Sequence, residues 1–134
     1  GALTALLAGL HFWWPKMTGR PFNDEVARIG AVLFVIGVNL ALVPYLILGM
    51  RGVPQDMGAF VPGPAGLNEL AALGWLVALA GIGVVVSNLI STLWSTEQAE
   101  ANPWGSTTLE WSAPSPPPED NFTSTPEVGG LYRY

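Results

Sequence analysis

The sequence predicts an all-α membrane protein with about two and a half transmembrane helices and an extended, proline-rich C-terminal tail. Composition is the first indication, because 50% of the 134 residues are hydrophobic and only 11% are charged. Soluble domains carry about 25% charged residues. The placement of the charges is the second indication, since residues 1–15, 29–50 and 70–96 contain none. Long uncharged apolar runs are typical of helices that cross a bilayer.

Segment 29–50 is the clearest predicted transmembrane helix. A helix of this length, at about 1.5 Å per residue, crosses the hydrocarbon core of roughly 30 Å. Asn23 precedes it as an N-cap residue, and Pro44 predicts a kink. Asn39 lies near its middle. We expect this amide to hydrogen-bond to another helix rather than to conduct protons.

Segment 70–94 is the second full-length span and follows the predicted outer loop 51–69. Small residues recur at four-residue spacing along two stripes of this helix, and such stripes allow the backbone of another helix to approach closely. We interpret the stripes as packing surfaces rather than ligand sites. Their members are Gly74 and Ala78 in one stripe, and Gly83, Ser87 and Ser91 in the other.

Segment 1–15 is apolar but spans only about 22 Å as a helix. It has no basic flank and no small-residue cleavage site, so it does not resemble a signal peptide. We interpret it as the second half of a transmembrane helix and expect the chain to be incomplete. The predicted loop 16–28 follows it.

The basic residues predict the orientation in the membrane. Lys16, Arg20 and Arg28 lie between the first two apolar segments, whereas the outer loop carries only Arg51. Because positive charge favours the cytoplasmic side, the first loop and the C-terminus are predicted to be cytoplasmic.

The tail, residues 95–134, differs from the rest of the chain. It holds six prolines and too few aliphatic residues to form a core of its own, so an extended conformation is expected. Its apolar side chains indicate that it lies along a protein surface. They are Trp104, Leu109, Trp111 and Phe122.

Composition also excludes several classes of function. A net charge of −5 argues against a nucleic-acid-binding protein. The absence of cysteine excludes disulfides, thiolate zinc sites and iron–sulfur clusters. The single histidine, His11, cannot build a metal centre alone, and we expect it to be an interfacial residue with one hydrated edge.

Three stretches carry a family resemblance. They are HFWWPKMTGR at 11–20, GVNLALVPYLILGMRGVP at 37–54 and ANPWGSTTLEWSAPSPPPEDNF at 101–122. Together they resemble the last helices and the C-terminus of subunit I of cytochrome c oxidase, a haem–copper terminal oxidase. The resemblance implies the last part of a twelve-helix bundle, from the end of helix ten through helices eleven and twelve. It further implies an enzyme that transfers electrons from cytochrome c to oxygen, forms water and pumps protons.

The resemblance also implies where the cofactors bind. The histidines that ligate the haems and the copper in this family precede Gly1, so the chain itself is expected to hold no metal ligand and no catalytic residue. One functional site of the family does fall within the chain. Its outer loop normally reads G-M-P-R-R, and the two arginines bind the haem propionates.

Gln55 and Asp56 occupy the positions of these two arginines. Gln55 can still donate a neutral hydrogen bond, whereas an ionised Asp56 repels a propionate. Three interpretations stay open: Arg51 or another cation compensates, the haem environment is altered, or the chain does not contact haem.

The implied partners are the remainder of subunit I, other oxidase subunits, cytochrome c and the lipid bilayer, with no nucleic acid. The implied location is the bacterial plasma membrane, with several membrane crossings. The alternative is a diverged, non-catalytic accessory subunit of a respiratory or photosynthetic complex. The Gln55–Asp56 pair favours this alternative, and the half-length first helix argues against it. An unrelated transporter segment would leave the tail resemblance as coincidence.

Overall fold

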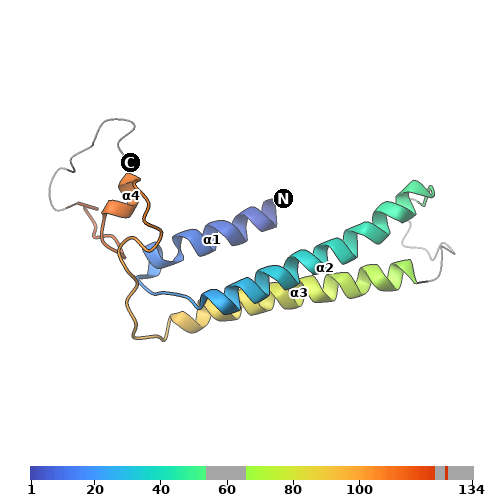
Figure 1. Cartoon of the computed structure of the whole chain (residues 1–134), viewed down its shortest axis with the longest axis horizontal. Helices are drawn as coiled ribbons and strands as arrows, with labels where there is room; N and C mark the ends of the chain where they lie inside the picture. Colours follow the sequence, from blue (N-terminus) through green and yellow to red (C-terminus); the bar gives the residue numbers. More distant parts are fainter. Residues whose placement is uncertain (54–65, 123–125, 127–134) are drawn as a thin grey trace. The chain divides into compact units, whose positions relative to one another are not determined.

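The computed structural model describes residues 1–53, 66–122 and 126 (Figure 1). All regular secondary structure in these residues is helical, which confirms the all-α prediction. The helices are α1 (Ala2–Thr18), α2 (Asp24–Met50), α3 (Leu67–Thr92) and the short α4 (Leu109–Ser112). Two compact units are present, one comprising Gly1–Phe22 with the chain from Leu89 onward, the other Asn23–Asn88.

α1 and α2 extend beyond the apolar segments from which they were predicted, whereas α3 begins three residues early at Leu67 and ends at Thr92, two residues before the predicted end of segment 70–94. α1 continues through Pro15 to Thr18 and ends at Gly19, which has a left-handed φ of 67°. α2 begins at Asp24, because the Asn23 side chain accepts hydrogen bonds from the first backbone N–H groups. The predicted loop 16–28 is therefore partly helical. Hydropathy indicates where the apolar stretch ends, whereas caps determine where the helix ends.

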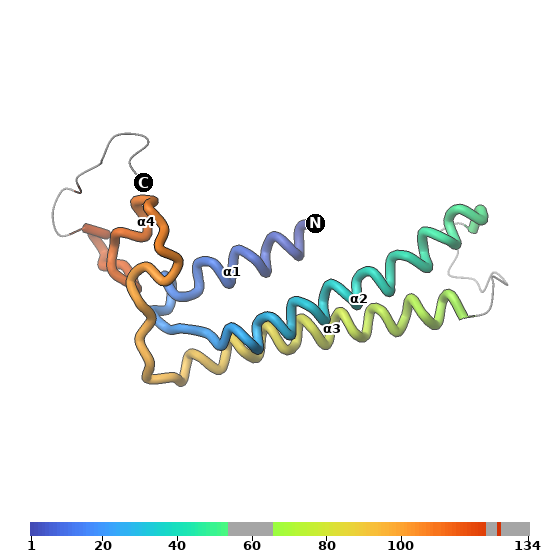
Figure 2. The backbone as a smooth tube through the Cα atoms, in the orientation of Figure 1, coloured from blue at the N-terminus to red at the C-terminus, as the bar shows by residue number. Residues whose placement is uncertain are grey.

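α2 and α3 form an antiparallel pair in the unit Asn23–Asn88 and lie side by side along most of their length (Figure 2). Both helices are long and apolar enough to cross a membrane. Their buried residues recur alternately three and four positions apart, which is the heptad pattern of two helices packed at a shallow angle. On α2 these are Ala27, Gly30, Phe34, Gly37, Ala41, Pro44 and Leu48; on the part of α3 that belongs to this unit they are Ala71, Gly74, Ala78, Gly81, Val85 and Asn88.

Glycines bring the two backbones into direct contact along this seam. A Cβ atom added at Gly37 would lie 2.2 Å from the Ala78 nitrogen, and one added at Gly74 would lie 2.3 Å from the Ala41 nitrogen. Such separations are far below the roughly 3.5–4.0 Å of ordinary carbon contacts. The seam therefore requires residues without a side chain at these positions.

Only one of the two predicted small-residue stripes lies in the seam. A Cβ atom at Gly83 would meet nothing within 4 Å among the described residues, and Ser87 is exposed. The stripe of Gly83 therefore does not contact α2, whereas Gly74 and Ala78 do.

Candidate functional site at the end of α1

Gln55 and Asp56, the predicted haem-contacting positions, lie outside the described residues. The structure reaches this loop only as far as Val53. Arg51 caps the C-terminus of α2, where its backbone N–H donates to the Ile47 and Leu48 carbonyls. The propionate-binding site therefore stays a prediction.

The described residues gather polar contacts around Lys16, in the last turn of α1. The Lys16 residue is 7% exposed. Its ammonium group donates a hydrogen bond to the carbonyl oxygen of Ala113 at 2.7 Å. Longer contacts of 3.3 and 3.4 Å reach the carbonyls of Ala101 and Pro114. The nitrogen also lies 5.0 Å from the ring centroid of Trp111, within cation–π range. One α1 side chain therefore fixes three points of the tail.

Aromatic rings extend this contact along α1. Phe12 stacks on Trp104 with ring centroids 5.9 Å apart and meets the edge of Trp111 at 5.2 Å. The Trp104 indole N–H donates to the Phe12 carbonyl at 3.0 Å. Trp111, on α4, is 1% exposed. We call Phe12, Lys16, Trp104 and Trp111 the tail-docking cluster.

The tail is thus ordered against α1 through residues whose apolar character indicated a surface contact. It is not extended throughout, because α4 forms one helical turn at Leu109–Ser112. Thr108 is the N-cap residue of this turn. The indole of Trp111, which belongs to the turn, packs against the ring of Phe12. A single turn without its own core depends on this packing for its stability.

A second set of contacts joins the same end of α1 to the C-terminus of α3. The indole N–H of Trp14 donates to the Thr92 hydroxyl at 2.8 Å. Arg20 donates to the Thr92 carbonyl at 3.3 Å and also to the Ser95 carbonyl. The last carbonyls of a helix lack partners within the helix, and a cation there is stabilised by the helix dipole. The Arg20 guanidinium therefore supplies both a hydrogen-bond donor and a positive charge to the last carbonyls of α3.

Burial sets the electrostatic state of Lys16, which lies outside the two long apolar helices. Desolvation lowers the pKa of its ammonium group below the usual 10.5, and the nearby Glu110 carboxylate opposes this by raising it. The Ala113 carbonyl oxygen and the Trp111 ring both lie next to the ammonium group, and both interact favourably with its positive charge. The site therefore binds its own tail through a partly desolvated cation.

His11 packs against neighbours within the first unit. Its Nδ1 lies 2.7 Å from the Leu7 carbonyl, and its ring meets Phe22 edge to face at 5.1 Å. Its Nε2 is buried and has no hydrogen-bond partner in the described part of the chain. The residue as a whole is partly exposed, so the expected hydrated edge stays a prediction.

Within residues 1–53, 66–122 and 126, no cluster of three or more histidine, cysteine or acidic side chains could hold a metal ion. The expectation that the ligands lie outside this chain stays an expectation.

Two long apolar helices paired through a small-residue seam define the chain as an all-α membrane protein. Its family follows from comparison. The family described as "Cytochrome C and Quinol oxidase polypeptide I" matches residues 1–86, and the chain belongs to this family. The resemblance inferred from the sequence is thereby confirmed.

Curated relatives match nearly the whole chain, including the tail. Cytochrome c oxidase subunit 1 of Bacillus subtilis is 39% identical over 135 residues, covering 98% of this chain and 22% of that protein. Heme-copper oxidase subunit I+III of Aeropyrum pernix is 36% identical, covering 92% and 15%. Probable quinol oxidase subunit 1 of Staphylococcus haemolyticus is 36% identical, covering 95% and 20%. The chain spans about a fifth of the length of the first of these relatives.

Sequence reasoning missed the role of Lys16, which it used only as a topological charge. A signal was present, because this lysine directly follows the apolar segment and its aromatic residues. The partners of Lys16, however, are 85 to 98 positions away in the sequence, and no local pattern identifies them.

Proposed function

We propose that this chain is the C-terminal part of the catalytic subunit of a haem–copper oxidase. The complete subunit transfers electrons from cytochrome c to oxygen, forms water and pumps protons. The observation that carries this proposal is the match to the Bacillus subtilis subunit over 98% of the chain. That match extends beyond residue 86, where the family match ends.

In this proposal the chain has a structural role in the enzyme. α2 and α3 close the helical bundle around the haems, and the loop after α2 covers the haem propionates. The tail docks at the end of α1 through the tail-docking cluster. The seam between α2 and α3 supports this role, because its backbone contacts form a rigid pair on which other helices can pack.

The proposed orientation places the tail-docking cluster on the cytoplasmic side of a bacterial plasma membrane. Lys16 and Arg20 support this, since both are basic and both lie at the end of α1 that contacts the tail. Trp13 is about half exposed and Trp94 is largely exposed. Tryptophans are enriched where a helix meets the membrane interface. The partners are the rest of subunit I and other oxidase subunits.

Haem and copper supply the electron transfer and oxygen chemistry in the complete subunit, and their ligands lie outside this chain. In this proposal Gln55 and Asp56 occupy the sequence positions of the family's propionate-binding arginines. A carboxylate in place of an arginine removes a charge-assisted hydrogen bond and raises a neighbouring propionate pKa.

Restoring the arginines tests this contact. The double variant Gln55→Arg with Asp56→Arg should shift the reduction potential of the adjacent haem, measured by spectroelectrochemistry on the purified oxidase. An Asp56→Asn variant, which removes only the negative charge, should give a smaller shift in the same direction. Unchanged potentials in both variants would show that this loop does not contact haem.

A diverged, non-catalytic accessory subunit is the second candidate. The Gln55–Asp56 pair favours it, because a chain that does not contact haem no longer needs the arginines.

The intact mass of the native polypeptide that ends at Tyr134 separates the two candidates. The complex would be extracted from membranes in detergent and the mass taken by mass spectrometry. A mass several times 14.2 kDa is expected for the catalytic subunit, and a mass near this value would indicate a separate subunit. Oxygen consumption with reduced cytochrome c, compared with a quinol, identifies the electron donor of the same complex.

A further inference from the structure

Two oppositely charged side chains lie at the N-terminal end of α2. Glu25 belongs to the first turn of the helix, and Arg28 follows three residues later. Both residues are exposed. Within the described part of the chain, neither side chain forms an ion pair or a hydrogen bond. Both charges are therefore available to an external partner.

A groove of about 490 Å³ runs from these two charges along an apolar stripe of α2. Val32 lies two residues from Gly30 and two from Phe34, which both face α3, so the stripe points away from α3 on a helix with 3.6 residues per turn. The groove is thus charged at one end and apolar at the other. Its lining residues are Glu25, Arg28, Ile29, Val32 and Leu33.

The change from charged to apolar lining falls at the expected edge of the hydrocarbon core. The uncharged run 29–50 spans about 33 Å as a helix, close to the roughly 30 Å of the core. Arg28 then lies at the level of the lipid headgroups, whereas Ile29 and Val32 lie beside the acyl chains. The groove therefore has the polarity of a single phospholipid molecule, read from headgroup to chain.

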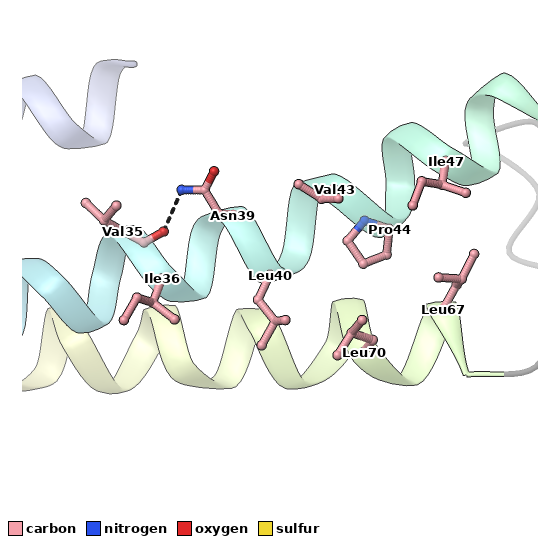
Figure 3. Close-up of a pocket in the computed structure, with 9 residues that line it drawn as sticks. All are labelled: Val35, Ile36, Asn39, Leu40, Val43, Pro44, Ile47, Leu67 and Leu70. Carbon is pink, nitrogen blue, oxygen red and sulfur yellow. Dashed lines mark hydrogen bonds between the residues drawn. The ribbon is translucent and has the colours of Figure 1, made fainter.

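A second groove of about 480 Å³, bordered by α2 and α3, has a different chemistry (Figure 3). None of the described residues that line it is charged. Its polar side chain, Asn39, donates to the Val35 carbonyl of α2 itself at 2.8 Å. That groove offers no charged group to a lipid headgroup, so the comparison points to the groove at Glu25 and Arg28.

We propose that the groove at Glu25 and Arg28 binds one phospholipid whose headgroup carries both a phosphate and a primary ammonium group, as in phosphatidylethanolamine. The Arg28 guanidinium donates to the phosphate, and the Glu25 carboxylate accepts from the ammonium. The Cβ atoms of residues three apart on a helix are about 5–6 Å apart, and an ethyl linker joins the two headgroup charges. One headgroup therefore reaches both side chains.

The charges at this end of α2 favour such a headgroup over others. An anionic lipid such as phosphatidylglycerol satisfies Arg28 but is repelled by Glu25 and by the neighbouring Asp24, which is exposed and does not line the groove. The quaternary ammonium of phosphatidylcholine has no N–H to donate to Glu25. Free phosphate has no chain to cover the apolar stripe. Only the zwitterionic headgroup with ammonium donors matches both side chains.

The proposal goes beyond the proposed function and does not depend on it. It requires only that α2 crosses a membrane, for which the helix is long and apolar enough. A failure of the lipid proposal would leave the catalytic-subunit assignment unchanged, and the reverse also holds.

Photo-crosslinking to lipids of defined composition tests the occupant. The native complex would carry a diazirine amino acid in place of Val32 and be reconstituted in nanodiscs. The bilayer would hold equal amounts of phosphatidylethanolamine, phosphatidylcholine and phosphatidylglycerol with identical acyl chains, so that only the headgroups differ. Intact lipid adducts would then be identified by mass spectrometry. We expect phosphatidylethanolamine adducts to exceed each of the others about two- to fivefold, a typical effect of one exposed ion pair.

Every other outcome overturns the proposal. Equal yields of the three adducts would show that the stripe contacts bulk lipid without selecting a headgroup. An excess of phosphatidylglycerol would show attraction by Arg28 alone. Peptide adducts without lipid would show that a protein segment covers the groove, and no adduct above the unirradiated level would show that no lipid lies there.

Matched variants assign the two charges. Both Glu25→Gln and Arg28→Gln change an exposed side chain, and each should reduce the preference for phosphatidylethanolamine over phosphatidylcholine to about the bilayer ratio. Asp24→Asn removes the adjacent negative charge outside the groove and should retain the preference. An equal fall in Asp24→Asn and Glu25→Gln would overturn the assignment of the ammonium to Glu25.

Discussion

Replacing Gly74 by alanine should weaken the packing of α2 against α3, although alanine is the better helix former. A Cβ atom at this position lies 2.3 Å from the Ala41 nitrogen and 2.6 Å from the Leu40 carbonyl carbon. Both atoms belong to the backbone of α2 and cannot move aside as a flexible side chain could. The two helices must therefore separate by about 1 Å to restore ordinary contact distances.

The size of the effect follows from a matched control in the same helix. Gly83→Ala changes the same residue type where nothing among the described residues lies within 4 Å. Both variants share the gain in helix propensity of about 1 kcal/mol, so it cancels in the comparison. Overpacking at Gly74 costs about 1–3 kcal/mol, so helix pairing should weaken by about 5- to 150-fold relative to Gly83→Ala.

Energy transfer between dyes on the two helices measures this difference. The chain contains no cysteine, so single cysteines at the exposed Leu46 and Leu76 give unique labelling sites. Pairing would be titrated by adding SDS to detergent micelles. If Gly74→Ala pairs as well as Gly83→Ala, or better, the inference that backbone contact requires glycine is refuted.

Three further predictions concern the end of α1. Lys16→Met leaves the buried Ala113 carbonyl without its donor at 2.7 Å; a hydrogen bond to a charged group contributes about 1.5–3 kcal/mol. Limited proteolysis should therefore cut the tail at least about tenfold faster than in the exposed-site control Arg28→Met, and equal rates would contradict the docking. Desolvation lowers the pKa of Lys16 below 10.5, so between the folded-state pKa and 10.5 the unfolded chain binds more protons than the folded chain. The stability of the folded chain should therefore rise with pH across this window. An NMR titration that gives the Lys16 side chain a pKa at or above 10.5 would contradict the desolvation. Trp14→Phe removes the 2.8 Å bond to Thr92 and should cost about 1 kcal/mol, observed as faster amide exchange at the C-terminus of α3, whereas an unchanged exchange rate would show the bond to be dispensable.

Much of the fold was predictable because its signals are local. Charge-free apolar runs identify α2 and α3, and Asn23 marks the start of α2 as a cap residue. The Gly74–Ala78 stripe was recognised as a packing surface. Its counterpart on α2, which includes Gly30 and Gly37, was not, although the same alternation of three and four residues is present in the sequence.

The sequence by itself determined the class of protein, its family and its apolar helices, because hydropathy and family patterns depend on residues close together in the chain. Only the tertiary structure decided which small-residue stripe faces a helix. It placed Gly74 against Ala41 and left Gly83 without a neighbour among the described residues. It also buried Lys16 under carbonyls from residues 101–114. The physical reason is that burial depends on groups brought together from distant parts of the chain, and local composition carries no record of those partners.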